Sequence, residues 1–432
     1  MTIAKMKQVH PSKQTGMRRS RTSQAGTVEE VVGSGLCTGC GLCASIAGPA
    51  ISMGINIEGN MRPLVRGEIG EQQNAKIMAV CPGVALTGPG EPEGVATHPV
   101  WGPMREFHRS WSAEPAVRQK AAAGGTLTAL GRYLLSSGRV DAVLHVRADD
   151  QKPWLSVSTV SRTPDEVLGA SQSRYGPGSP LVNVHRLLDA GVRFALIAKP
   201  CDISAVRALG RIDPRVGQLI PYMLTIFCGG VFSAQISKAV LRHHGVDERD
   251  VVLYRYRGEG WPGPLRVQTR DGSVYDLPYP AAYDTGKFGY ETQFRCKICP
   301  DQIGEAADIS APDGWILRDG KPIHEEAPGA NVAIVRTAVG QELLQAAVAA
   351  GFLEIAPVSV EEIDQMHAEK PPRKLAATAT MLALRLMGQK SLKLSGYRTV
   401  ISLKRAGLRG FLRQFAGTVR RVKAGDNREH LI

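Results

Sequence analysis

The sequence has no long apolar run and lacks the glycine-rich motifs of common nucleotide sites. No stretch of about eighteen or more consecutive apolar residues occurs, which is the length a membrane-spanning helix needs. The N-terminus has no apolar core of the kind that secretory signal peptides carry. No G-x-G-x-x-G follows an expected strand and no G-x4-G-K-S/T occurs, so a Rossmann NAD site and a P-loop are both unsupported. We therefore expect a cytoplasmic chain that uses neither site.

Basic residues are concentrated at the two ends of the chain. The net charge is +13, and residues 370–432 alone hold fifteen Lys and Arg against two Asp and Glu. Residues 1–28 add six basic residues and no acidic one, so the part between the ends is slightly acidic. No pattern of interleaved aromatic residues accompanies the bases, and we expect no nucleic-acid partner.

The basic C-terminal stretch has the pattern of an amphipathic helix. Between residues 398 and 423, apolar residues recur at helical spacing with Lys and Arg between them. This pattern suits peripheral contact with an anionic membrane surface, or docking to an acidic partner. It equally suits a terminal helix packed on its own domain, so both interpretations stay open.

Three of the eight cysteines form a ferredoxin-like motif. Eight cysteines in a reducing compartment are more often metal ligands than disulfides. Cys37, Cys40 and Cys43 have C-x2-C-x2-C spacing, but Ala47 stands where the ferredoxin run has its next cysteine. Cys81, followed by proline as in that run, is the expected fourth ligand. We predict one [4Fe-4S] cluster here; zinc is the alternative, although zinc ribbons use paired C-x2-C arms.

The other four cysteines suggest a second four-thiolate site. Cys201 and Cys228 each follow an expected strand, and the carboxyl ends of neighbouring parallel strands share one edge of a sheet. Cys296 and Cys299 form a C-x2-C loop that could close over that edge. We predict a second [4Fe-4S] cluster. The alternatives are an activated thiol at Cys201, a buried thiol at Cys228, and a redox dithiol in the loop.

The hydrophobic patterns predict a chain of mixed fold class, α/β and α+β. From about 110 to 240, strand and helix patterns alternate, which favours βαβ units and a mostly parallel sheet. We expect five parts: a disordered basic tail (1–28), a small ferredoxin-like iron-sulfur module (29–90), a mostly parallel α/β domain (104–245), an α+β domain that carries the C-x2-C ligands (246–360) and a basic helical tail (370–432).

The start of one expected helix has the composition of a phosphate cradle. The segment Gly124-Gly125-Thr126-Leu127-Thr128 leads into a helical pattern, and helix N-termini favour anions. A plain helix start with a flexible lead-in is the alternative.

Taken in order, the motifs resemble a known family. These are CTGCGLC, VCPG, GGTLTALGRYLLSSGRVDAVL, SRYGPGSP, KPCDISAVRAL, FCGG, YRYRGEGWPG and CKICPDQIGEAADIS. The chain resembles the beta subunit family of coenzyme F420 (deazaflavin) hydrogenases and dehydrogenases over about residues 33–340.

The resemblance implies an FAD in the central α/β domain beside a [4Fe-4S] cluster, with substrate on the exposed face of the flavin ring. The positions that match the family's flavin segments are Gly124, Gly125, Thr126, Thr128, Ser173, Arg174, Tyr175, Lys199 and Pro200. We take Lys199, Tyr175 and Trp261 as candidate catalytic side chains at the substrate face.

The expected function is therefore electron transfer to or from an organic molecule. Electrons would pass between a ferredoxin-like donor or partner subunit, two [4Fe-4S] clusters, FAD and a deazaflavin or other organic substrate. The alternatives are a non-catalytic electron-transfer subunit of a larger hydrogenase or dehydrogenase complex, and a cluster-bearing binding or sensing protein.

Overall fold

The computed structural model describes residues 23–431 except 90–91, 93 and 285–291. Most of the tail expected at 1–28 lies outside these residues. The described chain is ordered before residue 28, because Thr27 caps helix α1 (Val28–Gly33) by accepting a hydrogen bond from the Glu30 amide.

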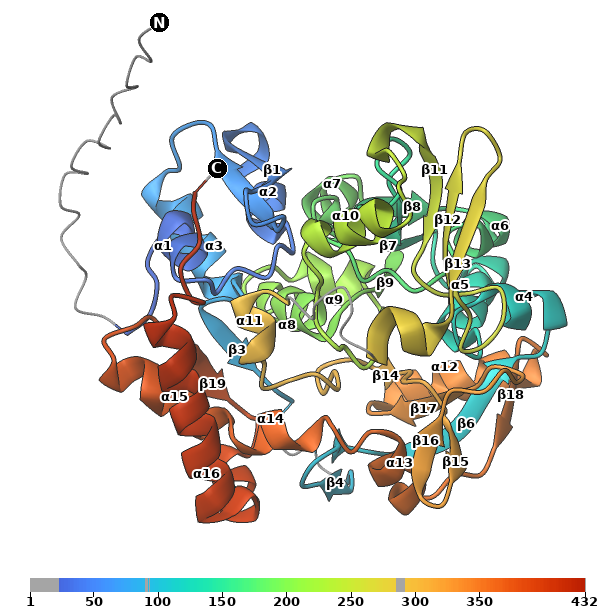
Figure 1. The fold of residues 1–432 in the computed structure, drawn as a ribbon. Coiled ribbons are helices and arrows are strands. Elements are labelled where there is room, and N and C mark those ends of the chain that lie inside the picture. Colours follow the sequence, from blue (N-terminus) through green and yellow to red (C-terminus); the bar gives the residue numbers. More distant parts are fainter. Residues whose placement is uncertain (1–22, 90–91, 93, 285–291, 432) are drawn as a thin grey trace, which may run out of the picture.

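An eight-stranded sheet forms the centre of the molecule (Figure 1). Its order is β18-β6-β17-β14-β10-β9-β7-β8. The strands are β6 (Glu106–Ser112), β7 (Ala142–Ala148), β8 (Ser156–Ser161), β9 (Phe194–Ile197), β10 (Tyr222–Thr225), β14 (Ile309–Ser310), β17 (Asn331–Val335) and β18 (Leu353–Ala356). Only β7, β9, β10 and β14 are parallel; the flanking strands pair antiparallel. The sheet is mixed, and the prediction of a mostly parallel sheet is correct for its inner four strands only.

Helices cover both faces of this sheet because successive strand residues point to opposite sides. Val143 and Ala195 pack with α5 (Thr126–Ser136) and α12 (Ala338–Ala349). Their neighbours Leu144 and Leu196 pack with α7 (Val184–Asp189) and α8 (Pro200–Leu209). The helix predicted after Gly125 is confirmed.

The predicted domain boundary at residue 245 does not match the structure. Strands β14, β17 and β18 lie beyond residue 245 but complete the same sheet as the strands before it, so the division at 245 cuts through one structural unit. The α+β character of the later segment is seen in a separate antiparallel sheet of β11 (Val251–Arg255), β12 (Leu265–Thr269) and β13 (Val274–Leu277).

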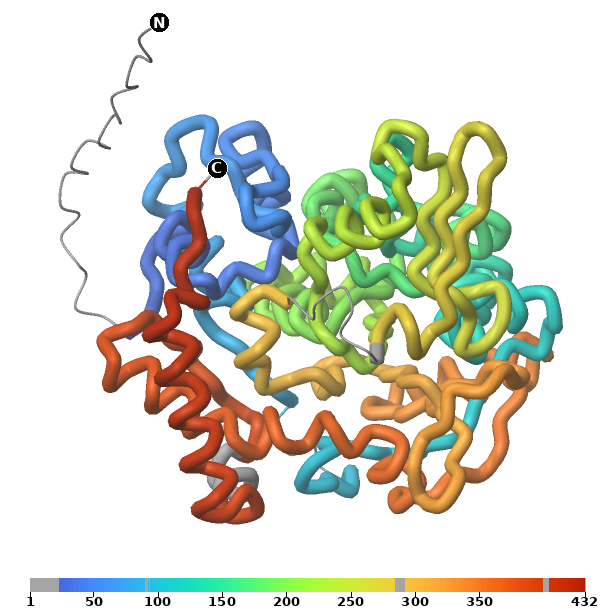
Figure 2. The backbone as a smooth tube through the Cα atoms, viewed as in Figure 1, coloured from blue at the N-terminus to red at the C-terminus, as the bar shows by residue number. Residues whose placement is uncertain are grey.

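The segment from residue 370 is not a detached tail. Strand β19 (Lys393–Ser395) pairs in parallel with β3 (Ala85–Thr87) of the N-terminal module, and Val422 and Leu36 belong to one hydrophobic core. Figure 2 shows this C-terminal part lying along the N-terminal part. Its helices are α14 (Pro371–Leu375), α15 (Ala377–Leu386) and α16 (Thr399–Lys423).

The N-terminal module combines short helices with one hairpin. It holds α2 (Leu42–Ala47), β1 (Ile51–Ile55), β2 (Met61–Val65) and α3 (Glu71–Val80). That it is ferredoxin-like stays a prediction. The remaining elements are β4 (Thr97–His98), β5 (Gly102–Pro103), α4 (Pro115–Lys120), α6 (Pro164–Gly169), α9 (Arg215–Leu219), α10 (Ala234–His243), α11 (Phe294–Lys297), β15 (Ile316–Arg318), β16 (Lys321–Ile323) and α13 (Val360–Met366). Among the described residues, no helix combines the length and apolarity needed to cross a membrane.

Candidate functional site

The four cysteines of the first set line one small cavity. Cys37 and Cys40 come from the loop that leads into α2, Cys43 lies in the first turn of α2, and Cys81 directly follows α3. Its open space is about 430 Å³, its mouth included, and its other walls are mostly apolar. Gly39 in this loop has a φ of 72°, and a Cβ there would lie 2.7 Å from the Met61 carbonyl oxygen. The glycine therefore lets the loop pack closely on β2.

This donor set fits an iron-sulfur cluster. Such clusters are held by cysteine thiolates, and four are present here. Burial raises the pKa of all four thiols, that of Cys40 to about 12, and bound metal would deprotonate them. Within the described residues, no three His, Cys, Asp or Glu side chains are grouped as ligands of one metal ion.

The second set of cysteines also meets in one cavity. Cys201 lies just beyond β9 and Cys228 just beyond β10, which are neighbouring parallel strands, as the sequence predicted. Cys296 and Cys299 come from α11 and the loop after it, and all four line a cavity of about 370 Å³. The Val231 amide donates to the Cys296 sulfur at 3.4 Å.

The alternatives for single members of this set are weakened by their surroundings. Burial raises the pKa of Cys201, Cys228 and Cys299, with the Asp202 carboxylate adding to the effect at Cys201. A reactive thiol needs a lowered pKa. One shared metal site accounts for all four residues together.

Side chains from the second cysteine loop bridge the two cavities. The Gln293 amide nitrogen lies 3.4 Å from the Thr38 carbonyl oxygen and 3.5 Å from the Cys296 sulfur. The buried Arg295 guanidinium donates to the Pro82 carbonyl, next to Cys81, at 3.1 Å. Thr38 itself lines both cavities. The two candidate clusters would therefore be near neighbours.

A larger cavity lies at the carboxyl ends of the parallel strands. Its open space is about 1000 Å³, its mouth included, a size suited to a dinucleotide-sized ligand. The N-terminus of α5 faces it, and its partial positive charge suits phosphate. The expected flavin-site residues that line it are Gly125, Thr126, Thr128, Ser173, Arg174, Tyr175 and Lys199.

Two expected flavin-site residues do not line this cavity. Gly124 lies behind it, where a Cβ would come within 2.7 Å of the Ser110 carbonyl oxygen and 2.8 Å of the Asn331 nitrogen. Gly124 thus allows the close approach that shapes the cavity wall. Pro200 lines the second cysteine cavity instead.

Arg174 has its donors engaged elsewhere. Its guanidinium donates to the carbonyls of Tyr254, Pro153 and Leu155, at 3.0, 2.7 and 2.5 Å respectively. It therefore holds the loop in place, and only the rest of the side chain is available to a ligand.

Lys199 stands between the large cavity and the second cysteine set, since it lines both. Its ammonium lies 2.7 Å from the buried Asp202 carboxylate. Burial lowers the pKa of Lys199, but Asp202 and Cys201 more than offset this and raise it above its usual value. Lys199 thus supplies a fixed positive charge and is a poor proton donor. Helix α8 begins at Pro200, and Asp202 in its first turn accepts a hydrogen bond from the Lys199 amide at 3.1 Å.

A fourth cavity, of about 1020 Å³, adjoins the large one. The two share Ser173, Tyr175 and Asn331 among other residues, and Gly230 is shared with the second cysteine cavity. Aromatic side chains dominate its wall: Tyr175, Phe227, Phe232, Tyr279, Tyr283, Trp315 and His367. Trp261 lines neither large cavity; it is buried behind Trp315, with ring centroids 5.1 Å apart.

The residues of these walls that were not expected from the sequence include four with polar or ionisable side chains. His145 and Asn331 line the large cavity, and Arg257 and His367 the fourth. Burial lowers the pKa of each histidine to about 4, so both are neutral near pH 7. Asn331 is the polar first residue of the otherwise apolar strand pattern NVAIV, and this is the one local signal that could have revealed it.

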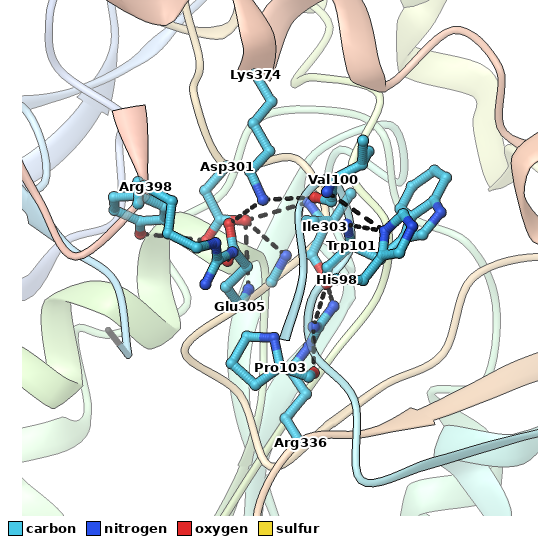
Figure 3. A network of polar contacts seen from close by, with 12 residues as sticks. His98, Val100, Trp101, Pro103, Asp301, Ile303, Glu305, Arg336, Lys374 and Arg398 are labelled. Atoms are coloured by element: carbon cyan, nitrogen blue, oxygen red, sulfur yellow. Dashed lines mark hydrogen bonds and ion pairs between the residues drawn. The ribbon is translucent and has the colours of Figure 1, made fainter. Parts of the chain in front are cut away.

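A buried ionic network supports the loop after Cys299 (Figure 3). Glu305 contacts Lys374 Nζ at 2.6 Å and also pairs with Arg398, and both cations come from the C-terminal part. Asp301 accepts from the Tyr397 hydroxyl at 3.3 Å. The C-terminal part therefore holds the loop that carries a candidate cluster ligand.

Comparison with known proteins identifies the family. Two family models of the coenzyme F420 hydrogenase/dehydrogenase beta subunit match the chain, one for its N-terminal part over residues 107–186 and one for its C terminus over residues 191–361. The chain belongs to this family. Both matched segments contribute to the central sheet and to the walls of the large cavities.

Similar proteins are named as oxidoreductases or their subunits. A coenzyme F420 hydrogenase subunit beta of Methanosarcina barkeri is 29% identical, over 57% of this chain and 80% of its own length. That of Methanothermobacter thermautotrophicus is 27% identical, over 65% and 98%. A coenzyme F420-dependent sulfite reductase of Methanocaldococcus jannaschii is 24% identical over 80% of this chain, which spans only half of that protein.

A solved structure has the same fold. It is a chain of the F420-reducing [NiFe] hydrogenase complex from Methanosarcina barkeri, with a TM-score of 0.53 and 23% sequence identity. The match covers 69% of this chain and 98% of that one.

Proposed function

We propose that this chain is an iron-sulfur flavoprotein oxidoreductase that passes electrons between a one-electron partner and an organic substrate. The observation that carries the proposal is a row of four adjoining cavities with shared walls. Thr38 joins the first cysteine cavity to the second, Lys199 joins the second to the large cavity, and Tyr175 joins that to the aromatic one.

The eight cysteines would hold two [4Fe-4S] clusters. Each set offers four thiols around a cavity far smaller than the other two. Backbone amides donate to the sulfurs of Cys37 and Cys296, each at 3.4 Å, which favours the thiolate form. Gln293 and Arg295 hold the two loops against each other.

The large cavity would hold FAD. When bound, FAD links carriers of single electrons to substrates that exchange two. The N-terminus of α5 suits its phosphates, and Gly124 and Asn331 keep the cavity open. Lys199 would place a fixed positive charge between the flavin and the second cluster.

The aromatic cavity would hold the substrate. The rings of Tyr279 and Trp315 lie next to each other, with centroids 5.6 Å apart, and both lie against the guanidinium of the buried Arg257. Arg257 pairs with Asp313 through two hydrogen bonds of 2.9 and 3.1 Å. Such a wall suits a planar ring system. Several relatives are named for coenzyme F420, so a deazaflavin is the first substrate to test.

Anaerobic purification with iron, sulfide and flavin quantitation tests the cofactors. About eight irons and one FAD per chain are expected from the count of cysteine ligands. Cys81→Ser and Cys228→Ser should each leave about four irons and the spectrum of the other cluster, so that each variant is the control for the other. Zinc without flavin would overturn the proposal.

Turnover tests the substrate cavity. Coenzyme F420 reduction by reduced ferredoxin, or by a dithionite-reduced dye, should slow in Trp315→Leu through a raised KM. Trp111→Leu, on strand β6 outside the cavity, should leave KM unchanged. Equal effects in both variants would assign the substrate to another place.

A second candidate is an electron-transfer subunit without a substrate of its own. Its support is the surface of α15 and α16, where Leu386 and Leu408 are 69% and 73% exposed among arginines. Such a surface suits an acidic redox partner. Clusters and flavin without turnover until a partner is added would favour this function.

A further inference from the structure

A buried ion pair beside the first cysteine set joins the N-terminal module to the C-terminal part. Arg62 Nε and Nη2 donate to the two carboxylate oxygens of Glu429, at 2.5 and 2.7 Å. The side chains are only 1% and 5% exposed. Glu429 lies outside both segments that match the family models, so family membership assigns it no role.

The position of Arg62 brings this pair against the candidate cluster. Its neighbour Pro63 lines the first cysteine cavity, and its other neighbour, Met61, packs on Gly39 between Cys37 and Cys40. The Arg62 side chain also donates to the Met61 carbonyl oxygen at 2.7 Å, which fixes it there. Arg62 and Glu429 are thus held rigidly next to the ligand loop.

The electrostatics of Cys37 agree with this placement. Burial raises the pKa of the Cys37 thiol, Arg62 lowers it and Glu429 raises it. These two are the charged side chains with the largest effects on Cys37. Charges in a poorly solvated site act strongly on one another.

The residues around Glu429 keep it in place. Asn427 is buried, and its side chain donates to Gln389 Oε1 at 2.8 Å. His430 Nδ1 lies 2.6 Å from a carboxylate oxygen of Glu58 in the N-terminal module. The segment is therefore anchored on both sides of Glu429.

We propose that Glu429 is a positioning residue that sets the reduction potential of the first cluster by partly neutralising Arg62. This inference rests on the proposed function, because it requires a cluster at Cys37, Cys40, Cys43 and Cys81. Reduction adds one electron to the cluster, so Arg62 favours the reduced form and Glu429 opposes it. The two charges act in opposite directions on the same equilibrium.

Potentiometric titration followed by EPR tests the proposal in the full chain. The relevant transition is the one that Cys81→Ser abolishes. Glu429→Gln should favour the reduced cluster by about tenfold, an upward shift of about 59 mV for a one-electron couple. Arg62→Gln should shift the potential downward, Arg62→Lys should stay near the unchanged protein, and the double variant Arg62→Gln/Glu429→Gln should return toward it.

Opposite shifts separate this role from simple anchoring. Loosening of the segment would admit water in both single variants and move the potential in the same direction. Glu58→Gln is the matched control, because it removes a carboxylate that holds the same segment through His430. Shifts of one sign, or a shift in Glu58→Gln equal to that in Glu429→Gln, would overturn the inference alone. Absence of iron from the first set would overturn the proposed function as well.

Discussion

Replacement of Glu305 tests whether the C-terminal part is integral to the fold. Its carboxylate is fully buried and forms ion pairs with two cations, Lys374 at 2.6 Å and Arg398, both from beyond residue 370. Lys374 also donates to the Val100 carbonyl oxygen at 2.5 Å, so the network reaches a third segment of the chain. Glu305→Gln keeps the shape of the side chain and removes its charge.

The expected loss follows from the geometry. Removing one partner of a buried ion pair costs about 3–5 kcal/mol, because the remaining charge stays buried without compensation. A chain of 432 residues loses about 0.9 kcal/mol of unfolding free energy per degree near its melting temperature if it unfolds as one unit. Glu305→Gln should therefore lower the melting temperature by about 3–6 °C, and by more if only the surrounding part unfolds.

Thermal melting followed by circular dichroism measures this shift. Glu325→Gln is the matched control, since it breaks the Arg318–Glu325 pair, whose side chains are both 60% exposed, and should leave the melting temperature unchanged. Glu305→Gln/Lys374→Met removes one of the two stranded cations and should recover part of the loss. A shift of Glu305→Gln no larger than that of Glu325→Gln would refute the reasoning.

Three further outcomes are expected. Burial lowers the pKa of His367 to about 4 in the folded chain, against about 6.5 when unfolded, so the unfolded state binds more protons between these two pH values. The free energy of unfolding should therefore fall as the pH drops from about 6.5 to 4. In thermal melts at stepped pH, His367→Gln should reduce this loss of stability. Gly124→Ala should lower flavin content at unchanged iron content, because its Cβ meets backbone atoms at 2.7 and 2.8 Å, whereas Gly169→Ala has open space and should bind flavin normally. Lys199→Gln should lower the reduction potential of the second cluster, and it should destabilise the chain because Asp202 stays buried without its cation. The double variant Lys199→Gln/Asp202→Asn should recover stability in the same melts.

The cysteine sites could be anticipated because their signals are local. C-x2-C-x2-C and the later Cys-Pro need only sequence spacing, and Cys201 and Cys228 need only the rule that neighbouring parallel strands end at one edge. Strands β9 and β10 obey that rule. That the cysteines bind iron stays a prediction.

Strand direction could not be read in the same way. The residues of a single strand do not record its direction, so the alternation of strand and helix patterns from about 110 to 240 led to a prediction of a mostly parallel sheet. The boundary predicted at residue 245 was wrong for the same reason, because the sequence does not show which distant strands pair with one another. Motif matching placed Arg174 at the flavin, but its hydrogen bonds to three backbone carbonyls depend on a loop geometry that no motif records.

The charges around the two cysteine cavities could not be predicted from the sequence, for a physical reason. Arg62 and Glu429 are 367 positions apart, and neither stands in a pattern that names its partner. The excess of bases after residue 370 suggested a surface for an acidic partner. Lys374 and Arg398 instead lie in the interior, where each needs a carboxylate. The net charge of a segment predicts the charge of its surface only where the charged side chains are exposed to water.

The C-terminal part therefore contributes charge at two points of the proposed electron route. Glu429 pairs with Arg62 beside the first cysteine set, and Lys374 and Arg398 pair with Glu305 beyond Cys299 of the second. A hydrophobic contact could anchor the segment in several registers, whereas a buried ion pair is costly in every arrangement except the one that joins its partners. The C-terminal part supplies the anion at one point and the cations at the other, so only one arrangement of the segment joins all the partners. The charge next to each candidate cluster would then be fixed by the same contacts that hold the segment.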